Sequence, residues 1–532
     1  MNNVIMILCD ELRADMLGCM GNEQVKTPHL DDLSKDCVVF EQAYCNSPMC
    51  VPSRVSIATG RYAHSHGALD NMLSPLDDEK SFYKTLQDKG YHTFNHGKWH
   101  CNINPLKFGM DSHTGGGTDQ NDIEKKVTCF GITDRELRKK TDYGRNNGEV
   151  PLIIYGTRPS HKDDTLDSLV TANYLSDLDA LTESGEIRKQ PIFARLSIMD
   201  PHTPYIPAEP YASMYKPEDI DLPVSFDEDL TGKPVLQKYF MKARGFDQVT
   251  EEEYRKSKAS YQGLVTPVDD RVGKVIKSLK DKDLYDESLL IFIADHGSMM
   301  GEHGFIEKWG YMYDQVVRIP LMIKLPESMM TQDMKGKHLD SFVESVDILP
   351  TVMEVLGIEQ TIEEAERVQG RSLLPYMTGQ VDKHKDKVFS QYYCGSLQNK
   401  SALMVRDNKY KLTSYPEGTD LEGFLPNDHP LKMSQMFDRD SVLGELYDLE
   451  KDPDEVNNLF DDPEYRQIKE KYLQELDKWM KSLGDVVDEA TMPAKNPLSF
   501  HVIRQGENML NAQAMLEGEK RWGKLKRKSF VC

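Results

Sequence analysis

Short apolar segments alternate with longer helical patterns along most of this chain, and no other feature limits its fold as strongly. Four segments are apolar almost throughout, at residues 4–8, 192–198, 289–294 and 320–325. Strands that are covered on both faces have this composition, and strands that alternate with helices favour a mainly parallel sheet between helical layers. We therefore predict an α/β fold in which a large mixed, mainly parallel sheet is sandwiched by helices.

The pattern changes after about residue 385. Residues 402–405 and 409–414 flank Asp407-Asn408, which predicts a β-hairpin, and residues 463–483 have the periodicity of an amphipathic helix. We predict three parts: a large domain over residues 1–385, a small C-terminal α+β domain with an antiparallel sheet over residues 386–484, and an extension with a basic tail over residues 485–532.

The charge of the chain limits its partners. The sequence has 65 Lys and Arg against 87 Asp and Glu, a formal net charge of −22. Because neutralising phosphates needs basic clusters, this balance argues against a nucleic-acid partner. No apolar run approaches the roughly 20 residues of a membrane helix, so we expect no membrane partner. The basic tail is expected to dock on its own or a neighbouring subunit. Docking on a neighbouring subunit would make the protein a homo-oligomer.

The cysteines and the first residues bear on the compartment. Nine cysteines, an odd number, are scattered without paired spacing, which is typical of a reducing compartment and not of a disulfide framework. The apolar residues 4–8 have no basic region before them and no small-residue cleavage site after them. They predict a first strand and not a signal peptide. Together these features predict a cytoplasmic protein.

Three of the apolar segments end in polar residues. The residues that follow are Asp10-Glu11, Asp200-Pro201-His202 and Asp295-His296-Gly297. Because ligands of open α/β sheets bind beyond the carboxyl ends of the strands, these three ends predict one shared site. Carboxylate oxygens from separate strand ends suit a hard cation such as Ca²⁺ or Mg²⁺.

The segment from Ser47 to Arg54 carries the most information about chemistry. Pro52 has the fixed φ of a first helical turn, so we predict a helix over residues 52–58 with Cys50 just before it. The free N–H groups of a helix N-terminus favour negative charge, and Arg54 is placed to reach back toward the same point. A nucleophile at Cys50 would lie in an anion-binding pocket. An ordinary buried cysteine is the alternative, but the set Cys-x-Pro-Ser-Arg arises by chance only on the order of once in several hundred sequences.

Cys50-Val51-Pro52-Ser53-Arg54 resembles the modification motif of the type I, formylglycine-dependent sulfatases of the alkaline phosphatase superfamily. The likeness runs from Val4 to about Phe460. It implies an alkaline-phosphatase-like fold with residues 1–385 as the catalytic sulfatase domain. It also implies that a separate formylglycine-generating maturation enzyme oxidises Cys50 to Cα-formylglycine, whose hydrated aldehyde supplies the nucleophilic hydroxyl.

The resemblance also implies a metal site. Its ligands would be Asp10, Glu11, Cys50 as formylglycine, Asp295 and His296. The resemblance favours one divalent ion, Ca²⁺ first, and the nitrogen of His296 keeps Mg²⁺, Mn²⁺ and Zn²⁺ as alternatives.

Five further residues receive catalytic roles from the same resemblance. Arg54 would hold the formylglycine diol, and Lys98 and Lys308 would neutralise sulfate oxygens. His100 would contact the diol as a base, and His202 would protonate the leaving alcohol. Lys98 and His100 stand in His96-Gly97-Lys98-Trp99-His100, which is similar to the family's Gly-Lys-Trp-His stretch.

These assignments predict a sulfuric ester hydrolase, or arylsulfatase-like enzyme, that cleaves a small-molecule or oligosaccharide sulfate monoester to alcohol and inorganic sulfate. The ester would be that of a sugar, an aryl alcohol or a steroid. A basic cluster within residues 125–145 would suit a polyanionic glycan. Five aromatic residues near the site would suit an aryl, steroid or sugar ring: Trp99, Tyr205, Trp309, Tyr311 and Tyr313.

Two other functions stay open from the sequence. A phosphonate monoester or phosphodiester hydrolase of the same superfamily would use nearly the same site, because its substrate is also a tetrahedral anion. A non-catalytic protein that binds sulfated glycans, with Cys50 never modified, is the alternative of another class.

Overall fold

The computed structural model describes residues 2–114, 155–393, 401–415 and 442–483. Its centre is an eight-stranded sheet with the order β13-β2-β12-β9-β1-β7-β4-β5. The strands are β1 (Asn3–Asp10), β2 (Val38–Phe40), β4 (His92–Gly97), β5 (Ser112–Thr114), β7 (Ile192–Pro201), β9 (Ser288–Ala294), β12 (Leu321–Lys324) and β13 (Lys337–Leu339). β1 is parallel to both of its neighbours, β7 and β9, whereas β12 is antiparallel to β9 and β2. The predicted mixed, mainly parallel sheet is confirmed.

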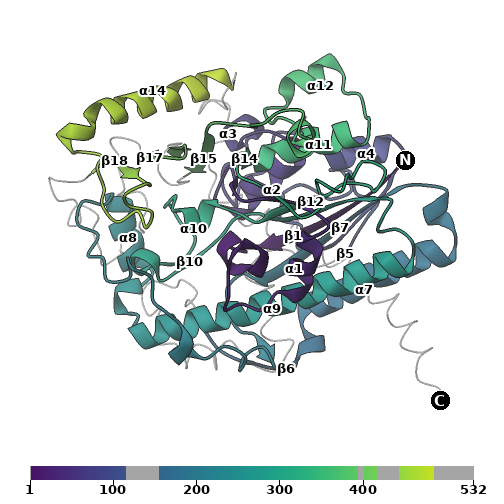
Figure 1. Ribbon diagram of the computed structural model, residues 1–532, viewed down its shortest axis with the longest axis horizontal. Helices are drawn as coiled ribbons and strands as arrows, with labels where there is room; N and C mark the ends of the chain where they lie inside the picture. The colour runs from purple at the N-terminus through teal and green to yellow at the C-terminus, as the bar shows by residue number, and fades with distance from the viewer. Residues whose placement is uncertain (1, 115–154, 394–400, 416–441, 484–532) are drawn as a thin grey trace, which may run out of the picture.

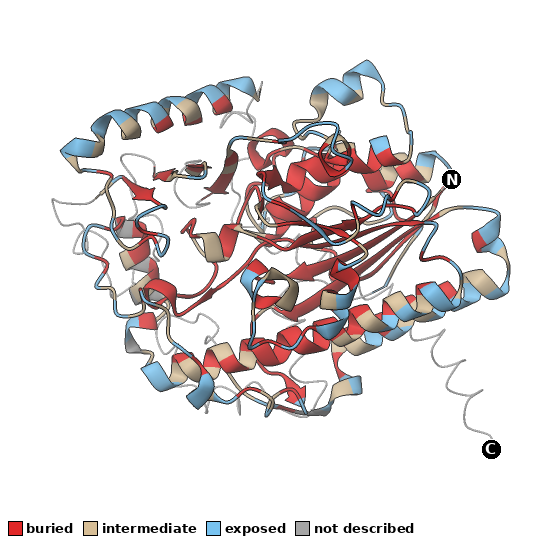
Figure 2. Ribbon diagram, viewed as in Figure 1, coloured by how far each residue is buried: buried red, intermediate tan, exposed pale blue. Residues whose placement is uncertain are grey.

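Helices cover both faces of this sheet (Figure 1). One layer contains α1 (Pro28–Ser34), α7 (Leu166–Glu183) and α9 (Glu251–Asp281), and the other contains α2 (Cys50–Thr59), α4 (Phe82–Asp88) and α11 (Ile348–Val355). Figure 2 shows the sheet and the inner sides of these helices as buried. Every residue of β1 and β9 is buried, as expected for strands between two helical layers. Among the described residues, no helix combines the length and the apolar composition needed to cross a membrane.

A four-stranded antiparallel sheet follows the large sheet in the sequence. It contains β15 (Val388–Tyr393), β16 (Ser401–Arg406), β17 (Tyr410–Ser414) and β18 (Gly444–Asp448), in that order. α14 (Arg466–Ser482) packs on it through buried Tyr472, Leu476 and Trp479. The predicted hairpin and amphipathic helix are therefore present. The domain limits at 385 and 484 stay predictions, and the extension at 485–532 and the basic cluster at 125–145 lie outside the described residues.

Candidate active site

Cys50 lies at the N-terminus of α2, which points at the carboxyl ends of the central strands. Met49 has the extended backbone of an N-cap, and the Ser53 N–H bonds the Met49 carbonyl at 3.0 Å, which closes the first turn. The prediction that the helix begins at Pro52 is wrong by two residues, and Cys50 is its first residue. Pro52 fits inside this turn because the first N–H groups of a helix have no partner within it.

The side chain of Cys50 is surrounded by candidate ligands. Its Sγ lies 3.2 Å from His296 Nε2, 3.6 Å from Asp10 Oδ1 and 3.6 Å from Lys98 Nζ, and the residue is 1% exposed. Burial, with a further contribution from Asp10, raises the pKa of the Cys50 thiol to about 12. An unmodified thiol here is protonated at neutral pH and is a poor nucleophile, since the thiolate is the reactive form.

Four of the five predicted metal ligands lie together. One ligand atom from each of Asp10, Cys50, Asp295 and His296 falls within 4.8 Å of the others, and all four residues are buried. Asp10 ends β1, and Asp295 and His296 directly follow β9, so the parallel pairing of these strands brings the residues to one edge. Two buried carboxylates and an imidazole form a donor set that fits a divalent cation.

Glu11 belongs to a different part of the site. Its carboxylate contacts the Lys308 ammonium, accepts a hydrogen bond from Ser298 Oγ at 2.7 Å and lies 3.3 Å from the Tyr205 hydroxyl. It is not among the four residues whose ligand atoms cluster within the described chain. Glu11 is therefore placed to orient Lys308.

Arg54 is fully buried and holds the side chains around Cys50 in place. Its Nε donates to Asp295 Oδ2 at 2.7 Å, and its Nη1 donates to Ser197 Oγ at 2.9 Å and to the Lys98 carbonyl at 3.1 Å. Its Nη2 lies 3.8 Å from Asp10 Oδ1. The guanidinium thus fixes Asp295 and the Lys98 segment, and the Lys98 ammonium contacts Asp10.

The two predicted catalytic histidines border the same site, and both are held neutral. Burial, followed by the Lys98 and Arg54 charges, lowers the pKa of His100 well below its ordinary value. Burial and the Lys308 charge do the same for His202. His202 Nδ1 donates to the Thr203 carbonyl at 2.6 Å, which leaves Nε2, 3.6 Å from Glu11 Oε2, as the nitrogen that faces the site.

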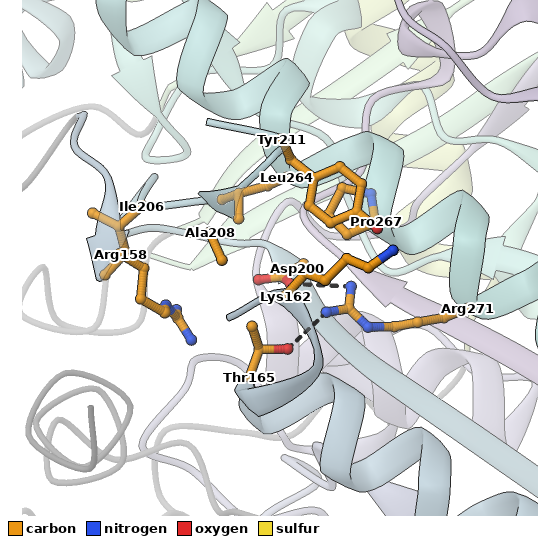
Figure 3. A pocket seen from close by; sticks show the side chains of 10 residues that line it. All are labelled: Arg158, Lys162, Thr165, Asp200, Ile206, Ala208, Tyr211, Leu264, Pro267 and Arg271. Carbon is orange, nitrogen blue, oxygen red and sulfur yellow. Dashed lines mark hydrogen bonds and ion pairs between the residues drawn. The ribbon is translucent and has the colours of Figure 1, made fainter. Parts of the chain in front are cut away.

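The segment that carries His202 borders a small pocket, whose lining includes Asp200 and Arg271 (Figure 3). Arg271 of α9 pairs with Asp200 at 3.2 Å and donates to Thr165 Oγ1, the N-cap of α7, at 2.9 Å. Arg158 and Lys162 line the same pocket. The Arg271 contacts fix Asp200 between two helices, two residues before His202.

The aromatic residues do not form the expected platform for a ring. Trp99, Tyr205, Tyr311 and Tyr313 are each at most 6% exposed. Trp309 stacks on Phe240 and on the Arg244 guanidinium, which lies 3.6 Å from the centre of the indole. Trp99, Tyr205, Tyr311 and Tyr313 therefore fill the core around the site, because their apolar area is buried there. For Trp309, which is only partly buried, a contact with a substrate ring stays a prediction.

Two supporting residues were not predicted from the sequence. Ser298 bonds Glu11, and it could have been found because it follows β9 by four residues, at the same strand end as Asp295. Ser197 lies within β7 and accepts a hydrogen bond from Arg54. The sequence gives no signal for this contact, because it depends on the pairing of β7 with β4, in which Ser197 lies opposite Gly97.

Comparisons with known proteins agree with this geometry. Residues 2–358 match the family model described as Sulfatase, and residues 301–442 match that of the N-sulphoglucosamine sulphohydrolase C-terminal region. The chain is 27% identical to the multifunctional alkaline phosphatase superfamily protein PehA of Trinickia caryophylli, over 91% of this chain and 96% of that one. It is 26% identical to an arylsulfatase of Clostridium perfringens, over 87% and 91%.

A solved structure with a similar fold is the phosphonate monoester hydrolase of Agrobacterium radiobacter. The TM-score is 0.70 at 21% sequence identity, and the match covers 92% of this chain and 97% of that one. This similarity shows a shared fold. The Sulfatase family model, in contrast, matches the amino-acid sequence over more than half of this chain. The chain therefore belongs to the sulfatase family.

Proposed function

We propose that this protein hydrolyses sulfate monoesters to an alcohol and inorganic sulfate, with a formylglycine made from Cys50 as the nucleophile. The observation that carries the proposal is the position of Cys50, buried at the start of α2 between His296, Asp10 and Lys98. Its protonated thiol is unreactive as it stands, and the cationic side chains around it suit a tetrahedral anion.

The residues of the chain divide the remaining tasks. Lys98 and Lys308 neutralise charge on the sulfate oxygens, and Arg54 keeps Asp295 in place. His202 directs Nε2 into the site and delivers a proton to the leaving alcohol. His100 then acts as the base that takes a proton from the second hydroxyl of the diol, so that the diol-bound sulfate collapses to the aldehyde and free sulfate. Both imidazoles are neutral before substrate binds, so His202 must gain its proton in the substrate complex, where the sulfate charge favours the imidazolium.

Asp10, Asp295 and His296 would hold the divalent metal, with Cys50 as formylglycine beside them and Glu11 next to Lys308. We place Ca²⁺ first and keep Mg²⁺, Mn²⁺ and Zn²⁺ as alternatives. When bound, the metal supplies Lewis-acid polarisation of the sulfate and of the attacking hydroxyl.

A phosphonate monoester or phosphodiester hydrolase is the second candidate. The similarity to PehA and to the phosphonate monoester hydrolase of A. radiobacter favours it. Hydrolysis of 4-nitrophenyl sulfate and of a 4-nitrophenyl phosphonate, which share one leaving group, separates the two candidates. We expect the higher kcat/KM on the sulfate.

Variants at Cys50 test the mechanism. Cys50→Ala and Cys50→Ser should reduce 4-nitrophenyl sulfate hydrolysis by about 10⁴-fold or more, because alanine has no nucleophile and an unoxidised serine cannot expel sulfate by regenerating a carbonyl. Retention of near wild-type activity would refute the proposal.

Mass spectrometry tests the non-catalytic alternative. The peptide that contains Cys50 is taken from the native host, and oxidation to formylglycine changes its mass because oxygen replaces sulfur. An unmodified peptide would favour a binding protein.

The cellular setting is also a proposal. The six cysteines that the structure describes are free, which supports a cytoplasmic protein, and a maturation enzyme must share its compartment. A homo-oligomer formed through residues 485–532 stays a prediction of the sequence.

A further inference from the structure

Arg195 is a fully buried cation that none of the roles described above uses. It lies in the middle of β7, opposite Asn95 of β4, and is 0% exposed. In the parts of the chain that the structure describes, its hydrogen-bond partners are two carbonyls and one hydroxyl, and no carboxylate lies within ion-pair distance. A charge that is withdrawn from water without a counter-ion is costly, and an apolar side chain suits a strand that is covered on both faces. The charge therefore points to a task that an apolar side chain cannot perform.

Two aromatic rings hold the guanidinium in one orientation. Its central carbon lies 5.1 Å from the centre of the Trp99 ring and 5.6 Å from that of Tyr83, and Nη1 donates to the Tyr83 hydroxyl at 3.4 Å. Tyr83 belongs to α4 and also stacks on Phe193, which is two residues before Arg195 and therefore on the same face of β7. Because cation–π contacts strengthen away from water, these rings hold the guanidinium in place without a carboxylate.

The guanidinium binds the backbone of the segment that carries two predicted catalytic side chains. Nη2 of Arg195 donates to the Lys98 carbonyl at 3.3 Å and to the Trp99 carbonyl at 3.4 Å. The Lys98 carbonyl also accepts a hydrogen bond from Arg54 Nη1 at 3.1 Å. Among the described residues, the Trp99 carbonyl has besides Arg195 only the weak thiol donor of Cys101, at 3.4 Å. Arg195 is therefore the main partner of the second carbonyl and a shared partner of the first.

The Trp99 carbonyl belongs to the peptide group that joins Trp99 to His100, and the backbone of His100 is strained. His100 has a φ of +42°, in the left-handed region that disfavours a side chain. Strain of this kind persists only where the surrounding structure enforces it. If the Trp99 carbonyl is released, the backbone can relax toward a negative φ, and the imidazole then turns away from the site.

We propose that Arg195 is a positioning residue that holds His100 in its catalytic orientation through the Trp99 carbonyl. The inference rests on the proposed sulfatase activity, in which His100 serves the release of sulfate. In that step His100 takes the proton of the second hydroxyl, the electron pair of the O–H bond forms the carbonyl, and the C–O bond to sulfate breaks. The transfer of the sulfuryl group to the enzyme depends instead on Lys98, whose carbonyl Arg54 continues to hold. Loss of Arg195 should therefore slow the release of sulfate and leave the transfer nearly unchanged.

The time course of 4-nitrophenol formation from 4-nitrophenyl sulfate tests this inference. Arg195→Met removes the charge and the donors at a similar side-chain length, and activities are expressed per formylglycine, measured by mass spectrometry of the Cys50 peptide. In a stopped-flow experiment we expect a burst of about one 4-nitrophenol per modified enzyme. A steady state about 10²-fold slower than in the wild type should follow. The rate constant of the burst should be at least about one third of the wild-type kcat.

Lys324→Met is the matched control, because it removes another buried cation that binds two carbonyls. Lys324 is 2% exposed, lies 4.6 Å from the centre of the Tyr285 ring, and donates to the Tyr285 and Leu325 carbonyls at 2.9 Å and 3.2 Å. It pairs with Leu290 of β9, toward the end of the sheet opposite to Asp295. Its replacement should leave both the burst and the steady-state rate as they are in the wild type.

Two results would overturn the role of Arg195. One is an equal fall of the first turnover and the steady state in Arg195→Met, since a residue that serves folding alone changes the fraction of active enzyme and not the ratio of two steps. The other is a kcat within about threefold of the wild type. Arg195→Gln, whose amide can still donate to one carbonyl, should show the same burst with a smaller fall in kcat, and it replaces the methionine variant if that variant does not fold. Wild-type enzyme that cleaves no 4-nitrophenyl sulfate would instead overturn the proposed function on which the inference rests.

Discussion

Acid stability should depend on His66, a buried imidazole beside the helix that carries Cys50. His66 ends α3 (Ala63–His66) and is 0% exposed. Its Nδ1 accepts the Ala68 N–H at 3.2 Å, and its Nε2 lies 3.1 Å from Ser56 Oγ. A neutral ring with its proton on Nε2 satisfies both contacts, and a second proton on Nδ1 would break the first. Burial, aided by the charge of Arg61, lowers the pKa of His66 to about 3.

The size of the effect follows from linkage. The unfolded chain binds a proton at His66 with an ordinary pKa of about 6.5, whereas the native chain does not until about pH 3. The stability is therefore unaffected well above pH 6.5 and falls as the pH falls below it. Between pH 7 and pH 5 the proton-binding partition function of His66 in the unfolded chain rises about 25-fold. The free energy of unfolding therefore falls by about 2 kcal/mol through this one residue.

His66→Asn isolates this contribution. The asparagine Oδ1 can accept the Ala68 N–H in an Asx-type turn, and it does not titrate. Urea unfolding followed by circular dichroism at pH 8, 7 and 5 measures the effect, and the difference at pH 8 gives the cost that does not depend on pH. Between pH 7 and pH 5, we expect the free energy of unfolding to fall by about 2 kcal/mol less in the variant than in the wild type. The same pH dependence in both proteins would refute the reasoning.

Four other perturbations have defined outcomes. Lys308→Met should lower kcat/KM on 4-nitrophenyl sulfate about 10²–10³-fold, because it removes one charge-stabilising donor; a change below threefold would exclude that role. Arg271→Met removes the buried ion pair with Asp200 and the hydrogen bond to Thr165, so unfolding in urea should show a loss of about 1–3 kcal/mol. Gly97→Ala should not yield folded protein by circular dichroism, because φ is +94° and the added Cβ would lie 2.0 Å from the Ser197 carbonyl oxygen. Chelation by EDTA should abolish activity, and Ca²⁺ should restore it more fully than Mg²⁺, Mn²⁺ or Zn²⁺.

Much of the fold was predictable because its signals are local. The apolar run at residues 4–8 forms β1, and the amphipathic periodicity of residues 463–483 forms α14. The order of the strands was not predictable, because pairing depends on contacts far apart in sequence. The antiparallel placement of β12 between β9 and β2 is such a case.

The sequence by itself determined the family, through the motif around Cys50, and it identified the carboxylates that follow the strands. The family model confirms that prediction. Those signals are local because a nucleophile, its helix and a strand-end carboxylate each require particular residue types at fixed spacing. Only the tertiary structure decided which of these residues meet: it gathers Asp10, Cys50, Asp295 and His296, and it pairs Glu11 with Lys308. Burial and pairing are properties of the packed chain, and no spacing along the sequence encodes them.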